Sequence, residues 1–284
     1  MKPFCAAFIG FVPVSFFVAY MACALPGGPS DNLEETVCGW FKERAAFAAW
    51  SMAAGRPNPD AWRSVPGSLP VTHKTRDSRV LRGYKISRTG AAANGFVLVA
   101  QGNAMLADQL LHDLGALADR GKDVYIYDYR GYGASEGKRR LKAIASDYRD
   151  IFDTLSSSNP KDQKLLYGIS FGGIVLLNVI GRGAQFHRAV IDSSPSRISH
   201  MGCPEPYDPV LNLPSDSSGL MIISGEKDTV VPPEDMRELI STARLRGAQT
   251  VVSAEFAHPF MDAERTVHEQ RQKMIADFLF TPAR

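Results

Sequence analysis

The chain has 284 residues, of which 45% are hydrophobic and 22% are charged, and its formal net charge is +2. This length and composition suit one large α/β domain better than two small domains. A nearly neutral chain without a long run of Lys and Arg excludes an electrostatic nucleic-acid surface, and we interpret residues 138–140 as a solvated helix start. The sequence contains no internal repeat and no long low-complexity segment.

The N-terminus predicts export from the cytoplasm. Residues 4–24 are apolar almost throughout, follow Lys2, and end in Ala22-Cys23-Ala24, which matches the small-residue cleavage pattern of a signal peptide. Two alternatives stay open. About 20 apolar residues can span a bilayer as an uncleaved anchor, and Cys23 can be lipidated if Met21-Ala22-Cys23 is a degenerate lipobox. In each case we expect a secreted, periplasmic or membrane-anchored protein.

Two cysteines, Cys38 and Cys203, lie beyond this leader. In an oxidising compartment they can form one disulfide, and the alternative is two unrelated buried thiols. The chain has no Cys-x-x-Cys and no His/Cys cluster with metal-ligand spacing, so no metal is predicted.

Residues 31–50 predict an amphipathic helix. Asp31 and Glu34 have the spacing of a capping pair, and apolar and aromatic side chains then repeat at helical spacing. We expect this helix to pack on the rest of the protein, and contact of its aromatic stripe with a membrane surface is the alternative. Residues 55–70 are rich in Pro and polar residues and predict an extended crossing.

From residue 71 onward the pattern alternates between strands and helices. Residues 71–75 and 80–87 predict an antiparallel hairpin. Further strands are expected at residues 95–100, 124–129, 164–169, 187–192, 220–224 and 250–256, and helices at 105–120, 144–155, 174–180, 233–245 and 262–280. This alternation predicts an α/β fold with a mostly parallel central sheet and helices on both faces. In such sheets ligands bind beyond the carboxyl ends of the strands.

One of these strand ends carries Gly168-Ile169-Ser170-Phe171-Gly172, a Gly-x-Ser-x-Gly pattern. At a tight strand-to-helix turn this pattern holds the serine in a strained conformation and lifts its hydroxyl clear of the sheet, where it can attack a substrate. The five residues alone also fit an ordinary glycine-rich turn, so the interpretation depends on partners elsewhere in the chain.

Those partners follow two later strands. A serine nucleophile needs a base, and the base needs an orienting carboxylate. Asp228 follows the strand that ends at residue 224, and His258 follows the strand predicted to end at residue 256. The order Ser170, Asp228, His258 is the one found in α/β-hydrolases. Asp192, which ends the strand at residues 187–192, is the alternative carboxylate.

With these motifs the chain resembles the α/β-hydrolases, in particular the small serine hydrolases that include protein depalmitoylases and lipid-acting members. The resemblance covers residue 71 to the C-terminus and rests on residues 101–103, 128–137, 167–173, 225–233 and 257–258. It implies Ser170 as nucleophile, His258 as general base and then acid, and Asp228 as its orienter. It also implies an oxyanion hole formed by the backbone N–H groups of Phe171 and Asn103. Members commonly begin the oxyanion loop with His-Gly, whereas this chain has Gln101-Gly102.

Together these features predict a leader or anchor at residues 1–24, a tether, helix and crossing at residues 25–70, and a catalytic domain at residues 71–284. The expected activity is hydrolysis of a carboxylic ester or thioester of a small-molecule or lipid substrate, without a cofactor. A serine peptidase and a non-catalytic binding protein of the same fold are the alternatives.

The interval that commonly holds a lid in this fold, residues 193–219, is too short for an elaborate cap. We therefore expect an open or lightly covered site. Its apolar wall is predicted to come from Met201, Pro204, Pro206, Tyr207 and Leu211.

Overall fold

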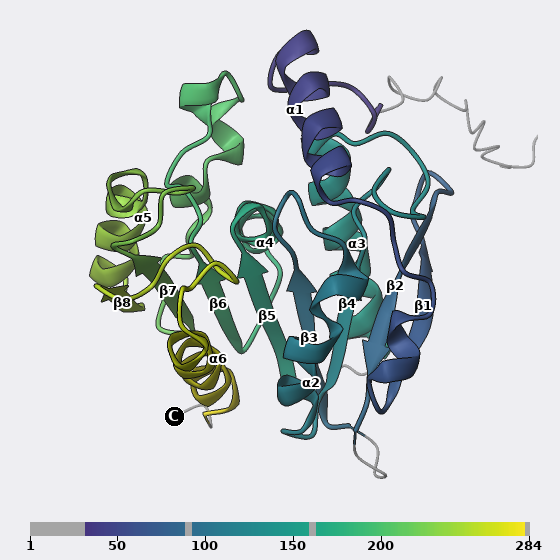
Figure 1. Cartoon of the computed structure of the whole chain (residues 1–284). Coiled ribbons are helices and arrows are strands. Elements are labelled where there is room, and N and C mark those ends of the chain that lie inside the picture. Colours follow the sequence, from purple (N-terminus) through teal and green to yellow (C-terminus); the bar gives the residue numbers. More distant parts are fainter. Residues whose placement is uncertain (1–31, 89–92, 159–162, 282–284) are drawn as a thin grey trace, which may run out of the picture. The chain divides into compact units, whose positions relative to one another are not determined.

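A computed structural model of the protein describes residues 32–88, 93–158 and 163–281, and the predicted leader lies outside these ranges. Residues 33–284 form one unit built around an eight-stranded sheet (Figure 1). The strands are β1 (Ser68–Lys74), β2 (Val80–Ile86), β3 (Gly95–Ala100), β4 (Asp123–Tyr127), β5 (Gln163–Ile169), β6 (Arg188–Asp192), β7 (Leu220–Gly225) and β8 (Gln249–Ser253).

The strand order is β1-β2-β4-β3-β5-β6-β7-β8. The pairs β1–β2 and β2–β4 are antiparallel, and every pair from β4 to β8 is parallel. The predicted hairpin and the predicted, mostly parallel sheet are therefore confirmed. Because the carboxyl ends of β3, β5, β6, β7 and β8 meet at one edge, the loops after them share that edge.

Helices cover both faces of the sheet (Figure 1). They are α1 (Trp40–Ala53), α2 (Leu111–Ala118), α3 (Leu141–Ser158), α4 (Phe171–Gly181), α5 (Pro233–Leu245) and α6 (Arg265–Phe280). The alternation of side chains along β3 divides the core in two. Phe96 and Leu98 pack in the cluster that includes α1, α3, α4 and α5, whereas Val97 and Val99 pack in the cluster that includes α2 and α6. The central strands are buried on both faces, which explains their continuous apolar runs.

The N-terminal helix begins later than its periodicity predicts. The chain forms turns before residue 40, and Gly39 has a φ of 83°, which a right-handed helix cannot contain. The carboxylate of Glu43 instead accepts hydrogen bonds from the backbone N–H groups of Val37 and Cys38, at 2.6 and 2.7 Å. Asp31 lies outside the described residues, and Glu34 forms ion pairs rather than a helix cap.

Several other boundaries differ from the prediction, and two of them lie in the segments after β3 and β8. The helix expected at residues 105–120 is a 3-10 turn, η2 (Ala107–Leu110), followed by the shorter α2, and the strand expected to reach residue 256 ends at Ser253. The backbone N–H of Glu226 bonds to the carbonyl of Ser253, and that of Lys227 to the carbonyl of Phe256. The residues after β8 thus turn toward the loop after β7 instead of extending the strand.

The segment between β6 and β7 contains only short 3-10 turns: η3 (Ser199–Met201), η4 (Glu205–Tyr207) and η5 (Pro209–Asn212). The buried carboxylate of Asp208 organises it by accepting the backbone N–H groups of Ile198 and Ser199, at 2.7 and 2.8 Å. This segment is a short cover rather than a lid domain, as its length predicts.

A disulfide joins Cys38, just before α1, to Cys203 in the segment between β6 and β7. Of the two alternatives left open by the sequence, the structure contains the bonded pair. Across the described parts of the chain, the helices are all too short or too polar to cross a membrane.

Candidate active site

The turn from β5 into α4 holds Ser170 in a backbone conformation that side chains rarely adopt. Ser170 has φ 53° and ψ −116°, a strained geometry that costs on the order of 1–3 kcal/mol and persists where surrounding structure enforces it. Here glycines permit the close packing around it. A Cβ on Gly172 would lie 1.9 Å from the carbonyl oxygen of Ala100, and one on Gly168 would lie 2.8 Å from the carbonyl oxygen of Gly172. The sequence therefore folds into the strand–turn–helix geometry of a nucleophile elbow.

Of the two predicted oxyanion donors, Phe171 directly follows this serine, and Asn103 belongs to a loop that approaches it. Phe171 is the first residue of α4, where a backbone N–H has no carbonyl of the same helix to bond. The loop after β3 approaches from the other side: a Cβ built on Gly102 would lie 3.9 Å from the Cβ of Ser170. Asn103 follows directly in that loop.

The structure explains how Gln101 holds this loop without the family's usual histidine. Its fully buried side-chain amide donates to the carbonyl of Tyr127, at 3.1 Å, and accepts from the hydroxyl of Tyr148, at 3.2 Å. Its backbone carbonyl accepts the hydroxyl of Tyr129 at 2.6 Å. Three buried tyrosine contacts therefore fix the start of the loop.

His258 and Asp228 form a hydrogen-bonded pair at the same edge of the sheet. His258 Nδ1 lies 2.9 Å from Oδ2 and 3.1 Å from Oδ1 of Asp228. Oδ1 also accepts the backbone N–H groups of Val230 and Val231, each at 2.9 Å. Burial alone would raise the pKa of Asp228, but the bonds from His258 and from these N–H groups hold it below its ordinary value. The carboxylate is therefore ionised and oriented toward the imidazole.

Asp192, the alternative carboxylate, has a different partner. Arg271 from α6 donates to both of its oxygens, from Nη2 at 2.5 Å and from Nε at 3.0 Å, and both side chains are fully buried. Burial raises the pKa of Asp192, opposed by the charges of Arg271 and His258. The backbone carbonyl of Asp192 accepts the N–H of Ser170 at 2.7 Å. Asp192 thus lies between the serine turn and the histidine loop without a hydrogen bond to His258.

Arg271 is the site residue that sequence reasoning missed. Besides Asp192, its guanidinium donates to the backbone carbonyl of Ala257 at 2.8 Å and approaches Asp262 Oδ1 at 3.4 Å. Asp262 Oδ1 in turn accepts the N–H of Ala257 at 2.8 Å. These contacts fix the residue before His258 on both sides. The available signal was an arginine at helical spacing from Val267 and the buried Ile275, on the core-facing side of the last helix.

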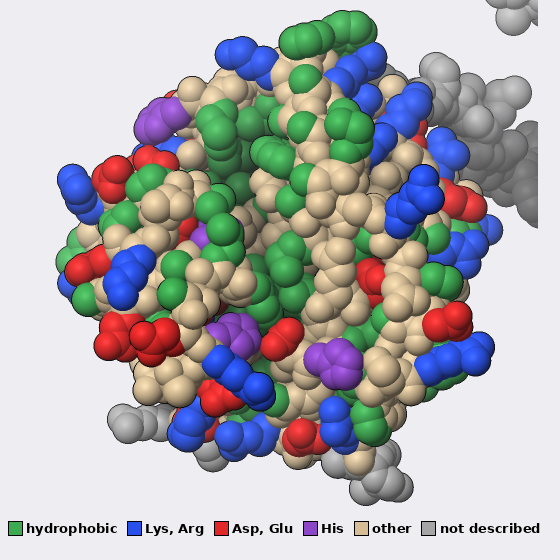
Figure 2. Space-filling model, in the orientation of Figure 1, with side chains coloured by type: hydrophobic (Ala, Val, Ile, Leu, Met, Phe, Trp, Pro, Cys, Tyr) green, Lys and Arg blue, Asp and Glu red, His purple; other side chains and the backbone are tan. Residues whose placement is uncertain are grey.

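An apolar cavity of about 250 Å³ lies beside the serine turn. It is lined by Cys38, Lys42, Glu43, Ala46, Phe47, Trp50, Leu141, Phe171, Ile174, Ile198, Met201 and Cys203. Figure 2 shows hydrophobic side chains gathered in a hollow of this face, next to α1. A second, larger and more polar groove includes His187, Gly219 and Gln249, which precede or begin β6, β7 and β8, so it lies at the opposite edge of the sheet.

The predicted apolar wall was therefore largely wrong. Of the five residues expected to form it, only Met201 lines the cavity beside the serine turn, and Leu211 lines the groove at the opposite edge. Tyr207 instead packs under the guanidinium of Arg182. No other described helix or strand contributes as many lining residues as α1, which the sequence does not place relative to the site.

Comparison with known proteins agrees with this fold. Residues 91–213 match the profile of the family Hydrolase_4, described as serine aminopeptidase, S33. The chain is 28% identical over 243 residues to the uncharacterized protein YfhR of Escherichia coli strain K12, covering 78% of this chain and 83% of YfhR. It is 29% identical over 123 residues to a monoacylglycerol lipase of Mycolicibacterium smegmatis, covering 42% and 44% of the two chains.

Among solved structures, the chain is similar to the esterase Pf2001 of Pyrococcus furiosus. The TM-score is 0.62 at 18% identity, over 80% of this chain and 96% of the esterase. The protein therefore has the α/β-hydrolase fold and resembles the lipid- and ester-cleaving branch of that fold. These likenesses support a hydrolase activity.

Proposed function

We propose that the protein is a serine hydrolase that cleaves carboxylic esters or thioesters through Ser170, His258 and Asp228. The observation that carries the proposal is the bond of His258 Nδ1 to Asp228, made at the same sheet edge as the strained turn of Ser170. With Nδ1 engaged by the carboxylate, Nε2 of His258 is the nitrogen left to accept the serine proton. Asp228 is favoured over Asp192 as the orienter because Arg271 already engages both oxygens of Asp192.

The reaction proceeds in two acyl-transfer steps. Ser170 Oγ attacks the substrate carbonyl as His258 takes its proton, and the oxyanion is bound by the backbone N–H groups of Phe171 and Asn103. Protonated His258 gives its proton to the departing alcohol or thiol. His258 then activates water, which releases the carboxylic acid and restores Ser170. Apart from the substrate and the water, every reacting group in this cycle belongs to the chain.

Hydrolysis of p-nitrophenyl butyrate tests the proposal. Ser170→Ala should lower kcat by about 10⁴-fold or more, because no other group can form the acyl-enzyme. Ser194→Ala is the matched control. Ser194 is also buried just after a strand end, and its hydroxyl has no hydrogen-bond partner among the described residues. The activity of this variant should stay within a fewfold of that of wild type. Wild-type turnover that survives in Ser170→Ala would defeat the assignment of the nucleophile.

A serine peptidase is the second candidate, since the matching family profile is described as serine aminopeptidase. An aminopeptidase needs an anion to bind the ammonium of its substrate. The one carboxylate lining the described cavity, that of Glu43, is occupied by three backbone N–H groups, at 2.6, 2.7 and 3.0 Å. An acyl chain therefore fits this cavity better. Aminoacyl-p-nitroanilides cleaved faster than butyrate esters would reverse this preference.

The same fold without catalysis remains the alternative from another class. It predicts a folded protein that binds a ligand and turns over neither esters nor anilides.

For localisation, we propose export, which the disulfide supports because such bonds persist in oxidising compartments. The intact mass of the secreted chain distinguishes cleavage after Ala24 from a lipid on Cys23 or a retained leader.

A further inference from the structure

Helix α1, which precedes the first strand of the sheet, forms a large part of the wall of the cavity beside Ser170. Phe47 and Trp50 of α1 pack on Phe171, with ring centroids 5.5 and 6.2 Å apart, and on each other at 5.2 Å. Ile174 lies one turn further along α4, and Met201 comes from the cover between β6 and β7. The cavity therefore begins at the residue whose backbone N–H is the proposed oxyanion donor.

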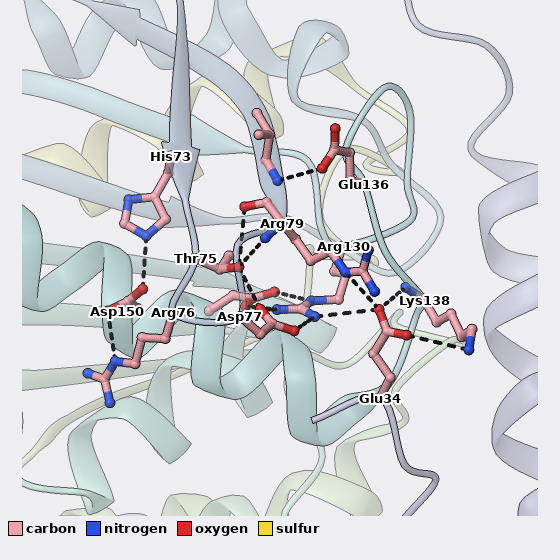
Figure 3. Close-up of polar contacts among 12 residues, drawn as sticks. Glu34, His73, Thr75, Arg76, Asp77, Arg79, Arg130, Glu136, Lys138 and Asp150 are labelled. Carbon is pink, nitrogen blue, oxygen red and sulfur yellow. Dashed lines mark hydrogen bonds and ion pairs between the residues drawn. The ribbon is translucent and has the colours of Figure 1, made fainter. Parts of the chain in front are cut away.

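A partly buried ion-pair cluster anchors the chain just before α1 (Figure 3). Glu34 pairs with Arg79 at 3.3 Å, with Lys138 at 3.5 Å and with the fully buried Arg130 at 3.6 Å. Arg130 is itself held by Asp77 and Asp147, at 2.5 and 2.6 Å. Because a buried charge is costly to separate from its partners, the pairing with Arg130 restrains the chain that enters α1.

Further contacts fix α1 along its length. Glu43 Oε1 accepts the backbone N–H of Leu141, the first residue of α3, at 3.0 Å. At the other end of α1, Gln109 donates to the carbonyl of Ala54 at 2.8 Å. The disulfide of Cys38 with Cys203 joins the start of the helix to the opposite wall, and both cysteines line the cavity.

On the basis of the proposed function, we propose that this cavity binds the acyl chain of the substrate and that α1 determines its length. A substrate carbonyl at the N–H of Phe171 directs its acyl chain past the Phe171 ring, toward Phe47 and Trp50. A water occupies about 30 Å³ of liquid and a methylene is similar in size, so 250 Å³ accommodates a chain of roughly eight carbons. The substrate class is thus a medium-chain acyl ester or thioester, and the disulfide holds the two walls together.

A chain-length series of p-nitrophenyl esters from acetate to dodecanoate tests the cavity. For wild type, kcat/KM should rise by up to about fourfold for each methylene buried, peak near octanoate and then level or fall. Ala46→Phe places a ring in the cavity, so its ratio of octanoate to acetate kcat/KM should fall at least about tenfold. For Ala46→Leu the same ratio should fall less, because the leucine side chain fills less of the cavity. Ala49→Phe puts the same ring on an exposed position of α1 that does not line the cavity, and it should keep the wild-type profile.

The disulfide supplies a second readout. The double variant Cys38→Ala/Cys203→Ala, and wild type in dithiothreitol, should both show a broader profile with a lower octanoate-to-acetate ratio. Dithiothreitol should not change the profile of the double variant any further. If the double variant and the reduced wild-type protein both kept the wild-type chain-length profile, the disulfide would have no role in determining the acyl-chain length.

Failure of this inference is distinguishable from failure of the proposed function. A wild-type protein that reacts with a fluorophosphonate at Ser170 but prefers acetate, or an Ala46→Phe variant that reacts normally and retains the octanoate preference, overturns the acyl cavity alone. A folded wild-type protein that neither reacts with the probe nor cleaves any ester overturns the proposed function. Reaction with the probe also verifies that each variant is folded.

Discussion

Two carboxylates lie at the carboxyl edge of the sheet, and their partners give them different roles. Asp228 bonds to His258 and to two backbone N–H groups, whereas Asp192 forms a buried pair with Arg271. The first arrangement orients an imidazole. The second neutralises a buried charge and ties the last helix to the serine turn, because the backbone of Asp192 also holds the N–H of Ser170.

This difference predicts opposite consequences for two matched substitutions. Asp228→Asn should lower kcat by on the order of 10⁴-fold with a small change in KM, because the histidine loses its oriented tautomer. Asp192→Asn should instead lower the free energy of unfolding by about 3–5 kcal/mol, since the Arg271 charge loses its buried partner. Ester kinetics and urea denaturation of both variants measure the two effects. If Asp228→Asn lost stability but kept full kcat, or if Asp192→Asn lost kcat but kept its stability, the assigned roles of the two carboxylates would be wrong.

Asp128 predicts a pH dependence of stability. Burial raises its pKa to about 7, opposed by the N–H of Ala107 and reinforced by Asp108. The folded protein therefore holds a proton that the unfolded chain releases near pH 4, so this group lowers the free energy of unfolding as pH rises from about 4 to 7. Asp128→Asn, which keeps the acceptor for Ala107, should flatten that decline. Melting curves at pH 5 and 8 measure it, and an unchanged pH slope in the variant would contradict the assignment.

At the scale of elements, the serine turn depends on the contact of β3 with the start of α4. That contact leaves no room at Gly172, where a Cβ would meet the backbone of Ala100. Gly172→Ala should therefore cost more than about 4 kcal/mol or prevent folding. Gly183→Ala is the control. The φ of Gly183 is +90°, but a Cβ built there would meet nothing within 4 Å, so the loss in the free energy of unfolding should stay at about 1–2 kcal/mol. Equal stability losses in urea would show that the close packing is not limiting.

The sequence predicted most elements because their signals are local. The strands of the parallel sheet are buried on both faces and appear as apolar runs, and the loops with Ser170, Asp228 and His258 follow three of those runs. Predictions failed where distant contacts decide the conformation. Bonds to Glu43 and the positive φ of Gly39 delay the start of α1, and the loop after β7 diverts the end of β8.

At the scale of the molecule, the contacts that complete the site join residues far apart in the chain. Arg271 reaches Asp192 across 79 positions, and the disulfide spans 165. The spacing of Arg271 places it on the core-facing side of its helix, but no periodic pattern in the sequence pairs it with Asp192 or pairs Cys38 with Cys203. This explains why the sequence could indicate the candidate reacting groups while it missed α1 as the main wall of the cavity, which only the assembled fold brings beside Phe171.

The disulfide also predicts a redox dependence of stability. Closing a loop of 165 positions restricts the unfolded chain, and loop entropy gives an upper figure of about 5 kcal/mol. Dithiothreitol should therefore lower the urea midpoint of wild type. The variant Cys38→Ala/Cys203→Ala should have the lower midpoint with or without the reductant. Identical midpoints for oxidised and reduced wild type would mean that the crosslink adds nothing to the fold.

The central claim is that Ser170 is the nucleophile of a serine hydrolase, and the most direct measurement is the site of fluorophosphonate attachment. Peptide mass spectrometry of the labelled wild-type protein should find one adduct, on the peptide that contains Ser170, and Ser170→Ala should carry none. A folded wild-type protein that stays unlabelled, or an adduct on a different residue, would contradict the account.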